Sequence, residues 1–433
     1  MKLAIVNGKI CTPECIKHGF DLIIENGKII NIRKSDGKTK IPADKIIDAK
    51  NNYVLPGFFD IHCHGAGLYD ACCGKYDYKK GIFSSKDEDY EQGIPEILKK
   101  HVLHGTTSMI LSSFATSQEN IKRFLGYGGY YTKHNPDNGS RLLGLDIEGI
   151  FLKNPAYAGA QNPDYFIKPE IRYFDRIMKL SGNAVKKILV APEWGKDALK
   201  FIRHITKNGI VAGVGHSGAT YEELIKAYQA GVKVIVHCGN GPMSQNFKDG
   251  GVIDALFYLR DKVTAELICD YHHVNPRWMV TFIKNFNFNI IGITDAMFVV
   301  ESPVKIKKEF KVGDKIGIID KDVLMLKGVK NILFGSLLTM DKAFQNFVNL
   351  FVKNTWGYLV GNLFEKPIGI DKAVIETSKI LSLNPAKLFK LDKLIGSIEK
   401  GKCADVLIME ISKKGNGYGC KLKSIILNGR KLI

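Results

Sequence analysis

The sequence lacks most features that mark secreted, membrane or zinc-finger proteins. Its nine cysteines are scattered and odd in number, and no two form a C-x-x-C pair, so we expect reduced thiols and a cytoplasmic protein. There is no run of about 18 uncharged apolar residues, which argues against a membrane-spanning helix. No signal peptide precedes the first strand-like residues, so secretion is not expected.

The charge is strongly positive without being patterned. Lysine and arginine number 62 against 44 acidic residues, a formal charge of +18. The lysines are spread over the whole length, with no basic block and no aromatic-basic motif, so no nucleic-acid partner is expected. Two interpretations of the charge stay open: a solvated lysine-rich surface, or a contribution to attracting an anionic substrate.

What the sequence does contain is a regular alternation of short apolar runs and helical stretches. With 433 residues, 45% of them hydrophobic, the chain can form one large domain and a smaller one. Helical stretches such as 221–230 and 276–286 separate the runs, which favours an α/β class and predicts a (β/α)8 TIM-type barrel. The eight runs are 57–64, 106–112, 142–148, 188–193, 210–216, 233–237, 264–270 and 289–295.

Both ends of the chain contain short strands followed by Asn-Gly pairs, which are typical of hairpin turns. We expect these strands to pair into one small β-sandwich domain built from both termini, residues 1–54 plus 391–433. The metal-dependent barrel hydrolase domain then occupies 55–390. The strand-like segments are 3–8, 22–27, 28–32, 404–409 and 422–429.

Most of the eight runs end on a residue that binds a metal or transfers a proton. The first contains His62 and His64, and residues i and i+2 of a strand point to the same face, so one ion could contact both. In a parallel barrel the carboxyl ends of the strands share one face, where active sites lie. The other runs end at Ser112, Glu148, Glu193, His216, His237, Asp270 and Asp295.

These strand ends predict a catalytic metal centre. Glu148, His216 and His237 supply a carboxylate and two imidazoles and leave a position open for water, as at catalytic zinc sites. Such an ion lowers the pKa of water to about 7. Each histidine alone is more simply read as a core residue, but the set of strand ends favours a metal.

Two aspartates near these ends have alternative interpretations. Asp295 can accept a proton from an activated water and return it to a leaving amine; the alternative is a helix N-cap. Asp60 is either a partner of a metal ligand or a structural carboxylate. Cys63 and Cys269, inside apolar runs, are expected to be small core residues.

In this order, the motifs resemble the N-acetylglucosamine-6-phosphate deacetylases of the amidohydrolase superfamily. The resemblance covers nearly the whole chain, and its most specific parts are the glutamate that ends the third run and the Gly-His-Ser motif. The matching segments are Leu55–Gly65, Gly105–Ser108, Leu145–Gly149, Leu189–Glu193, Gly215–Tyr221, Val236–Asn240, His273–Val274, Thr294–Ala296, Phe334–Ser336, Asn384–Ala386 and Gly396–Asp405.

The resemblance implies a barrel with a small β-sandwich, assembled as a homodimer. It implies that Asp295 is the general acid/base. It also implies one or two divalent ions per subunit, with Zn2+ the favoured ion and Fe2+ or another divalent ion as alternatives. Relatives that bridge two metals with a modified lysine have it on the fourth strand. Here that strand ends Ala191-Pro192-Glu193, which argues against dihydroorotase and urease activities. The implied metal ligands are Glu148, His216 and His237, with His62 and His64 for a second ion.

The resemblance also implies substrate contacts, and here the chain departs from the family. Ile150 stands in place of proline, Gln161 in place of a histidine, and Gly241 in place of alanine. Lys248 aligns with a phosphate-binding arginine that the neighbouring subunit contributes. All four changes concern the substrate and none concerns the metal. The implied contacts are Ala160, Gln161, Asn240, Gly241, Lys248, His273, Leu333, Phe334 and Gly335.

We therefore expect metal-dependent hydrolysis of the acetamido group of N-acetylglucosamine 6-phosphate, giving acetate and glucosamine 6-phosphate. One alternative is a deacetylase of another N-acetyl amino sugar, such as N-acetylgalactosamine 6-phosphate. A different kind of alternative is an inactive amidohydrolase-like binding or scaffold protein, against which the retained ligands argue.

Overall fold

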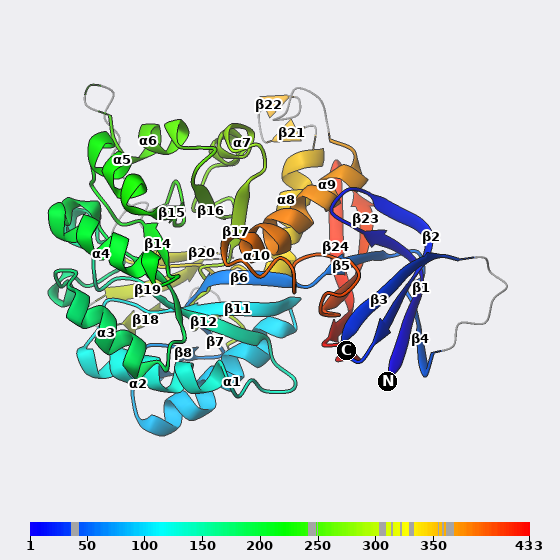
Figure 1. The fold of residues 1–433 in the computed structure, drawn as a ribbon, viewed down its shortest axis with the longest axis horizontal. Helices are drawn as coiled ribbons and strands as arrows, with labels where there is room; N and C mark the ends of the chain where they lie inside the picture. Colours follow the sequence, from blue (N-terminus) through cyan, green and yellow to red (C-terminus); the bar gives the residue numbers. More distant parts are fainter. Residues whose placement is uncertain are drawn as a thin grey trace. The chain divides into compact units, whose positions relative to one another are not determined.

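A computed structural model of the protein describes residues 1–35, 43–240, 248, 250–302, 309–312, 315–320, 323–328, 333–353, 355–356, 359–360 and 368–433 (Figure 1). The chain forms two compact units. Unit 1 comprises Met1–Asp60, Val102–Ser108 and Met340–Ile433, and unit 2 comprises Ile61–His101 and Met109–Thr339. The domain boundaries expected after residues 54 and 390 stay a prediction.

The eight apolar runs form the eight strands of a parallel barrel, as predicted. Their side chains are almost entirely buried, as expected for parallel strands covered on both faces. A parallel bridge between Cys63 and Ala296 joins the first strand to the segment after the last. In sheet order the strands are β6 (Phe58–Cys63), β11 (Thr106–Ser112), β12 (Arg141–Ile147), β13 (Val185–Leu189), β14 (Val211–Val214), β15 (Val232–Ile235), β16 (Thr264–Ile268) and β17 (Ile290–Ile293).

Helices lie on the outside of these strands, as Figure 1 shows for α2 to α7. In α4 the buried residues Ala198, Phe201, Ile202 and Ile205 recur at helical spacing, which gives one apolar face. The predicted helices at 221–230 and 276–286 are confirmed as α5 and α7. The helices are α1 (Asp87–Val102), α2 (Gln118–Tyr131), α3 (Ile171–Leu180), α4 (Lys196–Lys207), α5 (Tyr221–Ala230), α6 (Val252–Tyr258) and α7 (Pro276–Asn285).

Unit 2 also contains two small antiparallel sheets. The aromatic residues Tyr76, Phe298, Phe310 and Phe334 belong to one buried cluster that joins them to the segment after β17. The strands are β7 (Gly65–Ala66), β8 (Tyr69–Asp70), β9 (Gly74–Asp77) and β10 (Ile82–Ser84) in one sheet, and β18 (Glu309–Val312), β19 (Lys315–Asp320) and β20 (Val323–Leu326) in the other. Short 3₁₀ helices are η1 (Pro155–Tyr157), η2 (Pro163–Tyr165) and η3 (Pro192–Trp194).

Unit 1 is rich in β-structure and joins the two ends of the chain, as predicted. Antiparallel pairing of β23 with β5 brings them into one sheet, of order β25-β24-β23-β5-β1-β2-β3, with β4 beside β1. Its strands are β1 (Lys2–Cys11), β2 (Ile16–Glu25), β3 (Lys28–Lys34), β4 (Lys45–Asp48), β5 (Tyr53–Pro56), β23 (Val406–Lys414), β24 (Gly417–Leu427) and β25 (Arg430–Lys431). The unit also has α8 (Met340–Val352), β21 (Thr355–Trp356), β22 (Leu359–Val360), α9 (Ile370–Ser378), the π-helical η4 (Lys379–Leu383) and α10 (Asn384–Leu388).

The Asn-Gly pairs have two different roles. Asn26-Gly27 and the pair at 428–429 connect hairpin strands with positive φ at both residues, as predicted. The pair at Asn7-Gly8 lies inside β1, so the hairpin prediction is wrong there. The register of β1 shifts at Gly8, and a Cβ at this position would lie 2.5 Å from Val54. Glycine therefore permits a β-bulge beside β5.

Across the part of the chain that the structure describes, no helix combines the length and hydropathy needed to cross a bilayer.

Candidate metal centre and active site

The predicted ligands gather around the carboxylate of Glu148, directly after β12. Its Oε1 lies 3.3 Å from His216 Nε2 and 3.2 Å from His237 Nε2. Its Oε2 lies 3.1 Å from His62 Nε2 and 3.3 Å from His64 Nε2. Each oxygen of one carboxylate thus faces its own pair of imidazoles.

These separations fit metal coordination. Two donor atoms bonded to one tetrahedral zinc ion at ~2.1 Å lie about 3.4 Å apart, close to the four distances above. Glu148 with His216 and His237 forms one buried set of potential ligands, and Glu148 with His62 and His64 forms another. Imidazole and carboxylate suit zinc, iron and other divalent ions. The residues therefore fit one ion or two, with Glu148 shared between them.

Three residues of the centre have a backbone conformation that L residues rarely adopt. His216, His237 and Asp295, each just after a barrel strand, have φ of 48°, 30° and 51°. Such positions cost of order 1–3 kcal/mol each and cluster at functional sites. Here the strained turns after β14 and β15 place His216 and His237 beside Glu148, and the turn after β17 places Asp295 beside His64.

Hydrogen bonds orient His216 and fix the loop that carries it. Its Nδ1 lies 3.2 Å from the carbonyl of Tyr157, so Nδ1–H donates and Nε2 is left with its lone pair towards Glu148. Glu193, after β13, accepts from Ser217 Oγ at 2.8 Å and from the Gly218 amide at 2.6 Å. The strand-end glutamate thus stabilises the Gly-His-Ser loop.

Asp295 completes the centre. Its Oδ1 lies 3.1 Å from His64 Nε2, and its amide donates to the carbonyl of His62 at 2.9 Å. Residues 296–302 form a bridge and turns, so Asp295 does not cap a helix and that alternative is wrong. Burial raises the pKa of the carboxyl, but the hydrogen bond from His64 and the nearby imidazoles outweigh it and lower the pKa to about 2. Asp295 is therefore a carboxylate at neutral pH.

The ligands differ in their own proton affinities. Burial lowers the pKa of His64, yet hydrogen bonds to Asp295 and Glu148 raise it to about 9. Burial dominates at His237, whose pKa is lowered. At His62 the attraction of Glu148 and a second carboxylate, Glu266, overcomes burial, and the pKa is raised. His62 and His237 both contact Glu148, so Glu266 is the contact that distinguishes them.

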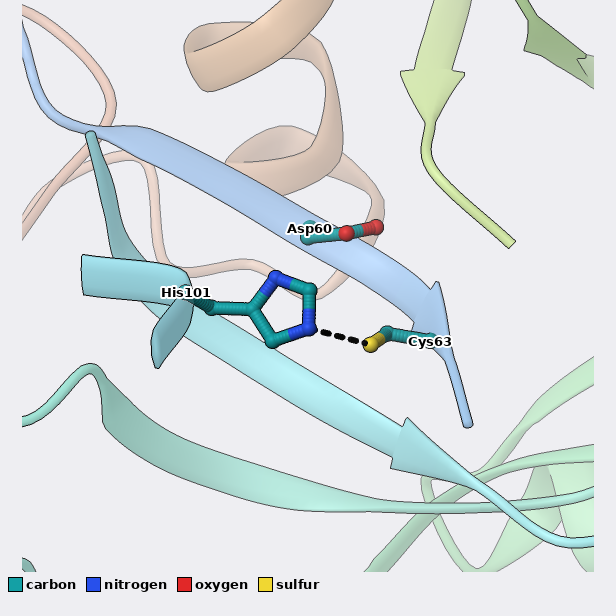
Figure 2. Close-up of side chains that lie close together, drawn as sticks. All are labelled: Asp60, Cys63 and His101. Carbon is teal, nitrogen blue, oxygen red and sulfur yellow. Dashed lines mark hydrogen bonds between the residues drawn. The ribbon is translucent and has the colours of Figure 1, made fainter. Parts of the chain in front are cut away.

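Along β6 the side chain between the two ligands points elsewhere. Cys63 is fully buried, and its Sγ lies 3.2 Å from Nε2 of His101 on α1. Figure 2 shows the side chains of Cys63 and His101 pointing toward each other. Asp60, on the same strand, is also fully buried. Alternation along the strand thus places His62 and His64 on one face, as predicted, and Cys63 is a core residue, as predicted.

A pocket of about 900 Å3 opens onto the centre. It reaches His64, Glu148, His216, His237 and Asp295. Lys248 is exposed and is not among the pocket residues of a single chain, while Gly241 lies outside the described residues. The other expected substrate contacts all line the pocket: Ala160, Gln161, Asn240, His273, Leu333, Phe334 and Gly335.

Two of these contacts are oriented by neighbours. The Nδ1 of His273 lies 2.6 Å from Asp270 Oδ2, so Nδ1–H donates and the other ring nitrogen is left for a ligand. Gln161 Oε1 accepts from the Ala115 amide at 2.8 Å, which leaves its NH2 as the free donor group. Asp270, another predicted strand end, therefore orients a neighbouring histidine.

Among the pocket residues that the sequence interpretation missed, two contact predicted site residues or the loop that carries one of them. Phe114 stacks on His64 with ring centroids 3.9 Å apart. Lys315, on β19, donates to the carbonyls of Ala160 at 2.9 Å and Gly159 at 3.2 Å and so stabilises the loop that carries Gln161. No local motif marks either residue, because each acts through a contact distant in sequence.

It also missed three charged residues inside the barrel: Asp146, Lys187 and Glu266 are all fully buried. A signal was present for two of them, because each has apolar neighbours inside a strand, in Leu145-Asp146-Ile147 and Ala265-Glu266-Leu267. Lys187 follows a second lysine, Lys186, in β13 and is not marked in this way. Buried charges of this kind are rare unless they are paired.

Comparisons with known proteins agree with this geometry. No protein-family model matches the chain. The N-acetylglucosamine-6-phosphate deacetylase of Lysinibacillus sphaericus is 27% identical over 393 residues, which cover 90% of this chain and 89% of the relative. The solved structure of the enzyme of that name from Thermotoga maritima superposes with a TM-score of 0.75 at 25% identity, covering 99% of both chains.

Over nearly its whole length the chain is similar to N-acetylglucosamine-6-phosphate deacetylases of the amidohydrolase superfamily. The matches extend over both units, as the sequence motifs suggested. An N-acetylgalactosamine-6-phosphate deacetylase of Escherichia coli O157:H7 is also 27% identical, over 362 residues that cover 82% of this chain and 83% of the relative. Because relatives named for two sugars have the same identity, identity alone does not decide the sugar.

Proposed function

We propose that this chain is an amide hydrolase that removes the acetyl group of N-acetylglucosamine 6-phosphate, giving glucosamine 6-phosphate and acetate. The observation that carries the proposal is the arrangement of Glu148, with an imidazole pair at each oxygen and Asp295 alongside, in a pocket of about 900 Å3. The nine cysteines, none of which forms a disulfide bond in the part of the chain that the structure describes, support a reducing, cytoplasmic setting.

In this proposal Glu148, His216 and His237 hold one divalent ion, and His62 and His64 with Glu148 hold a second. The donor set favours zinc, with iron(II) as the next choice. A bound ion supplies the Lewis acidity that activates water and polarises the acetamide carbonyl. The protein contributes fixed imidazole orientations, such as the bond from His216 to Tyr157.

Asp295 is the proton carrier. Its low pKa keeps it ionised, so it can accept a proton from the attacking water. It then delivers that proton to the nitrogen of the sugar as the C–N bond breaks. One water molecule is consumed and its atoms are divided between acetate and the free amine.

The remaining pocket residues position the sugar phosphate. His273 offers a ring nitrogen oriented by Asp270, Asn240 offers an amide, and Gln161 offers its NH2 group. We assign Lys248 to the phosphate bound in a neighbouring subunit of a homodimer, because it does not line the pocket of its own chain. Lysine binds phosphate as a point charge.

A panel of substrates tests the proposal. Acetate release is measured for N-acetylglucosamine and N-acetylgalactosamine, each with and without a 6-phosphate, using protein loaded with zinc or iron(II). We expect N-acetylglucosamine 6-phosphate to give the highest kcat/KM. A preference for the galacto epimer would instead favour N-acetylgalactosamine-6-phosphate deacetylase activity, for which the Escherichia coli relative is named. No acetate from any substrate would refute the proposal.

A further inference from the structure

A buried group of charges lies inside the barrel, beside the metal centre. Lys187 on β13, Asp146 on β12 and Glu266 on β16 are fully buried. Lys187 Nζ lies 2.8 Å from Glu266 Oε1 and 3.2 Å from Asp146 Oδ2, and it donates to the carbonyl of Ile61 at 3.0 Å. The three N–H donors of the ammonium therefore each have a partner.

Such a group is costly, which indicates a role beyond stability. Desolvation of buried ions costs several kcal/mol per ion, and apolar residues of similar volume often serve stability equally well. Burial lowers the pKa of Lys187, but Asp146 and Glu266 outweigh it and raise the pKa above its usual value, so the lysine is charged. The Asp146 carboxylate also accepts from Ser112 Oγ at 2.9 Å.

The group ends at His62. Glu266 uses Oε1 for Lys187 and Oε2 for His62 Nδ1, 3.0 Å away. A carboxylate only accepts, so Nδ1–H donates, and Nε2 is directed at Glu148 Oε2, 3.1 Å away. Lys187 also holds the carbonyl of Ile61, the residue before His62. One ammonium thus fixes both the backbone and, through Glu266, the ring of His62.

We propose that Lys187 and Glu266 are positioning residues that make His62 a metal ligand, so that the ion at the His62–His64 pair depends on them. The inference rests on the proposed metal centre. The other imidazole pair is oriented differently, since His216 donates to the neutral carbonyl of Tyr157. Loss of the buried charges should therefore affect one ion and spare the other.

Glu266→Gln tests this with little change of shape. Lys187 needs an acceptor, so it holds the amide oxygen and turns the NH2 group towards His62 Nδ1. The ring must then accept at Nδ1 and carry its proton on Nε2, where it can no longer bind a metal. Loss of such a partner of a metal ligand costs about 10–100-fold in metal affinity. We expect the second ion to bind at least tenfold more weakly and the first to be unaffected.

The readouts are the number of ions per chain, their affinities, and the visible absorption of the cobalt(II)-substituted protein. Adding Lys187→Met to Glu266→Gln removes the ammonium that held the amide oxygen at position 266. The amide can then turn this oxygen towards Nδ1–H of His62, so the double variant should recover part of the affinity for the second ion. A purely structural role predicts a further loss instead. Glu376→Gln, which changes a buried carboxylate paired with Lys379 in unit 1, is the matched control and should leave both ions unchanged.

If Glu266→Gln does not fold, Glu266→Asp is the second variant. It keeps the charge opposite Lys187 but shortens the reach to His62, so the second ion should again be weakened. Unchanged ion number, affinity and cobalt spectrum in a folded variant would overturn this inference and leave the proposed function in place. A wild-type protein that binds no divalent ion and releases no acetate would instead refute the proposed function on which the inference rests.

Discussion

The imidazole of His64 and the carboxylate of Asp295 lie 3.1 Å apart between Nε2 and Oδ1, although the two residues follow the first and the last strand of the barrel. The contact lies where β17 meets β6, beside the bridge between Cys63 and Ala296. Closure of the barrel therefore brings the proposed acid/base to a proposed ligand of the second ion.

Asp295→Asn keeps the shape of the side chain and removes the proton acceptor. We expect kcat to fall by about 100-fold or more, in line with general acid–base contributions, while metal content and KM stay near wild type. Steady-state kinetics and metal analysis check this. The exposed Asp261→Asn is the matched control. Near-normal turnover would assign the proton transfer to another group.

Glu148→Gln should remove both ions, because the two oxygens of Glu148 face the two histidine pairs separately. His237→Ala should lose one ion and nearly all activity, since three protein ligands leave little redundancy. His62→Ala should reduce activity less. Metal analysis with acetate release checks all three variants. If His62→Ala lost as much activity as His237→Ala, this result would show that hydrolysis requires both ions.

Stability of the metal-free protein should depend on pH through the pair of His64 and Asp295. The pKa of His64 is raised to about 9, so its stabilisation is complete below about pH 6.5 and is lost as pH rises through 9. The pKa of Asp295 is lowered to about 2, so its stabilisation is present above about pH 4 and is lost as pH falls towards 2.

Urea unfolding of the chelated protein between pH 4 and 9.5 measures the alkaline change. His64→Gln should abolish the loss of unfolding free energy above neutral pH. Zinc should abolish it too, because a metal ligand is already deprotonated. An alkaline loss of equal size in His64→Gln would assign the effect to other groups.

The sequence predicts the barrel and its site to different depths. The apolar runs locate all eight strands. Their last residues include Glu148, His216 and His237, because the functional side chains of a parallel barrel lie at the carboxyl ends of its buried strands. Pairings distant in sequence are not readable in this way. Contacts such as Glu266 with His62, Lys315 with the loop at 159–161, and Phe114 on His64 depend on which strands become neighbours. Asn7-Gly8 shows that one motif serves a hairpin or a bulge according to its partner strand.

Lys248→Ala should raise KM for the phosphorylated sugar by about tenfold or more, as expected for the loss of a charge-assisted bond. The effect should vanish for the sugar without phosphate. Lys248→Arg should be tolerated, because a guanidinium fits phosphate oxygens. The alternative, a solvated loop lysine, predicts unchanged kinetics with both substrates, and an equal loss with both would point to a structural role for the loop.

A mixture of two impaired variants, assayed at a substrate concentration well below KM, tests whether Lys248 acts on a neighbouring subunit. In a heterodimer of Lys248→Ala with Asp295→Asn, one pocket combines the intact Asp295 of the first chain with the intact Lys248 of the second. Random exchange of equal amounts should therefore restore about a quarter of wild-type activity. The other pocket of each heterodimer lacks both groups and stays inactive. If Lys248 serves its own pocket, every pocket in the mixture is defective and the activity does not rise above the residual activity of the Lys248→Ala chains. A protein that stays monomeric in sedimentation experiments at assay concentration would equally contradict the assignment, because the phosphate would then have to be bound by residues of the same chain.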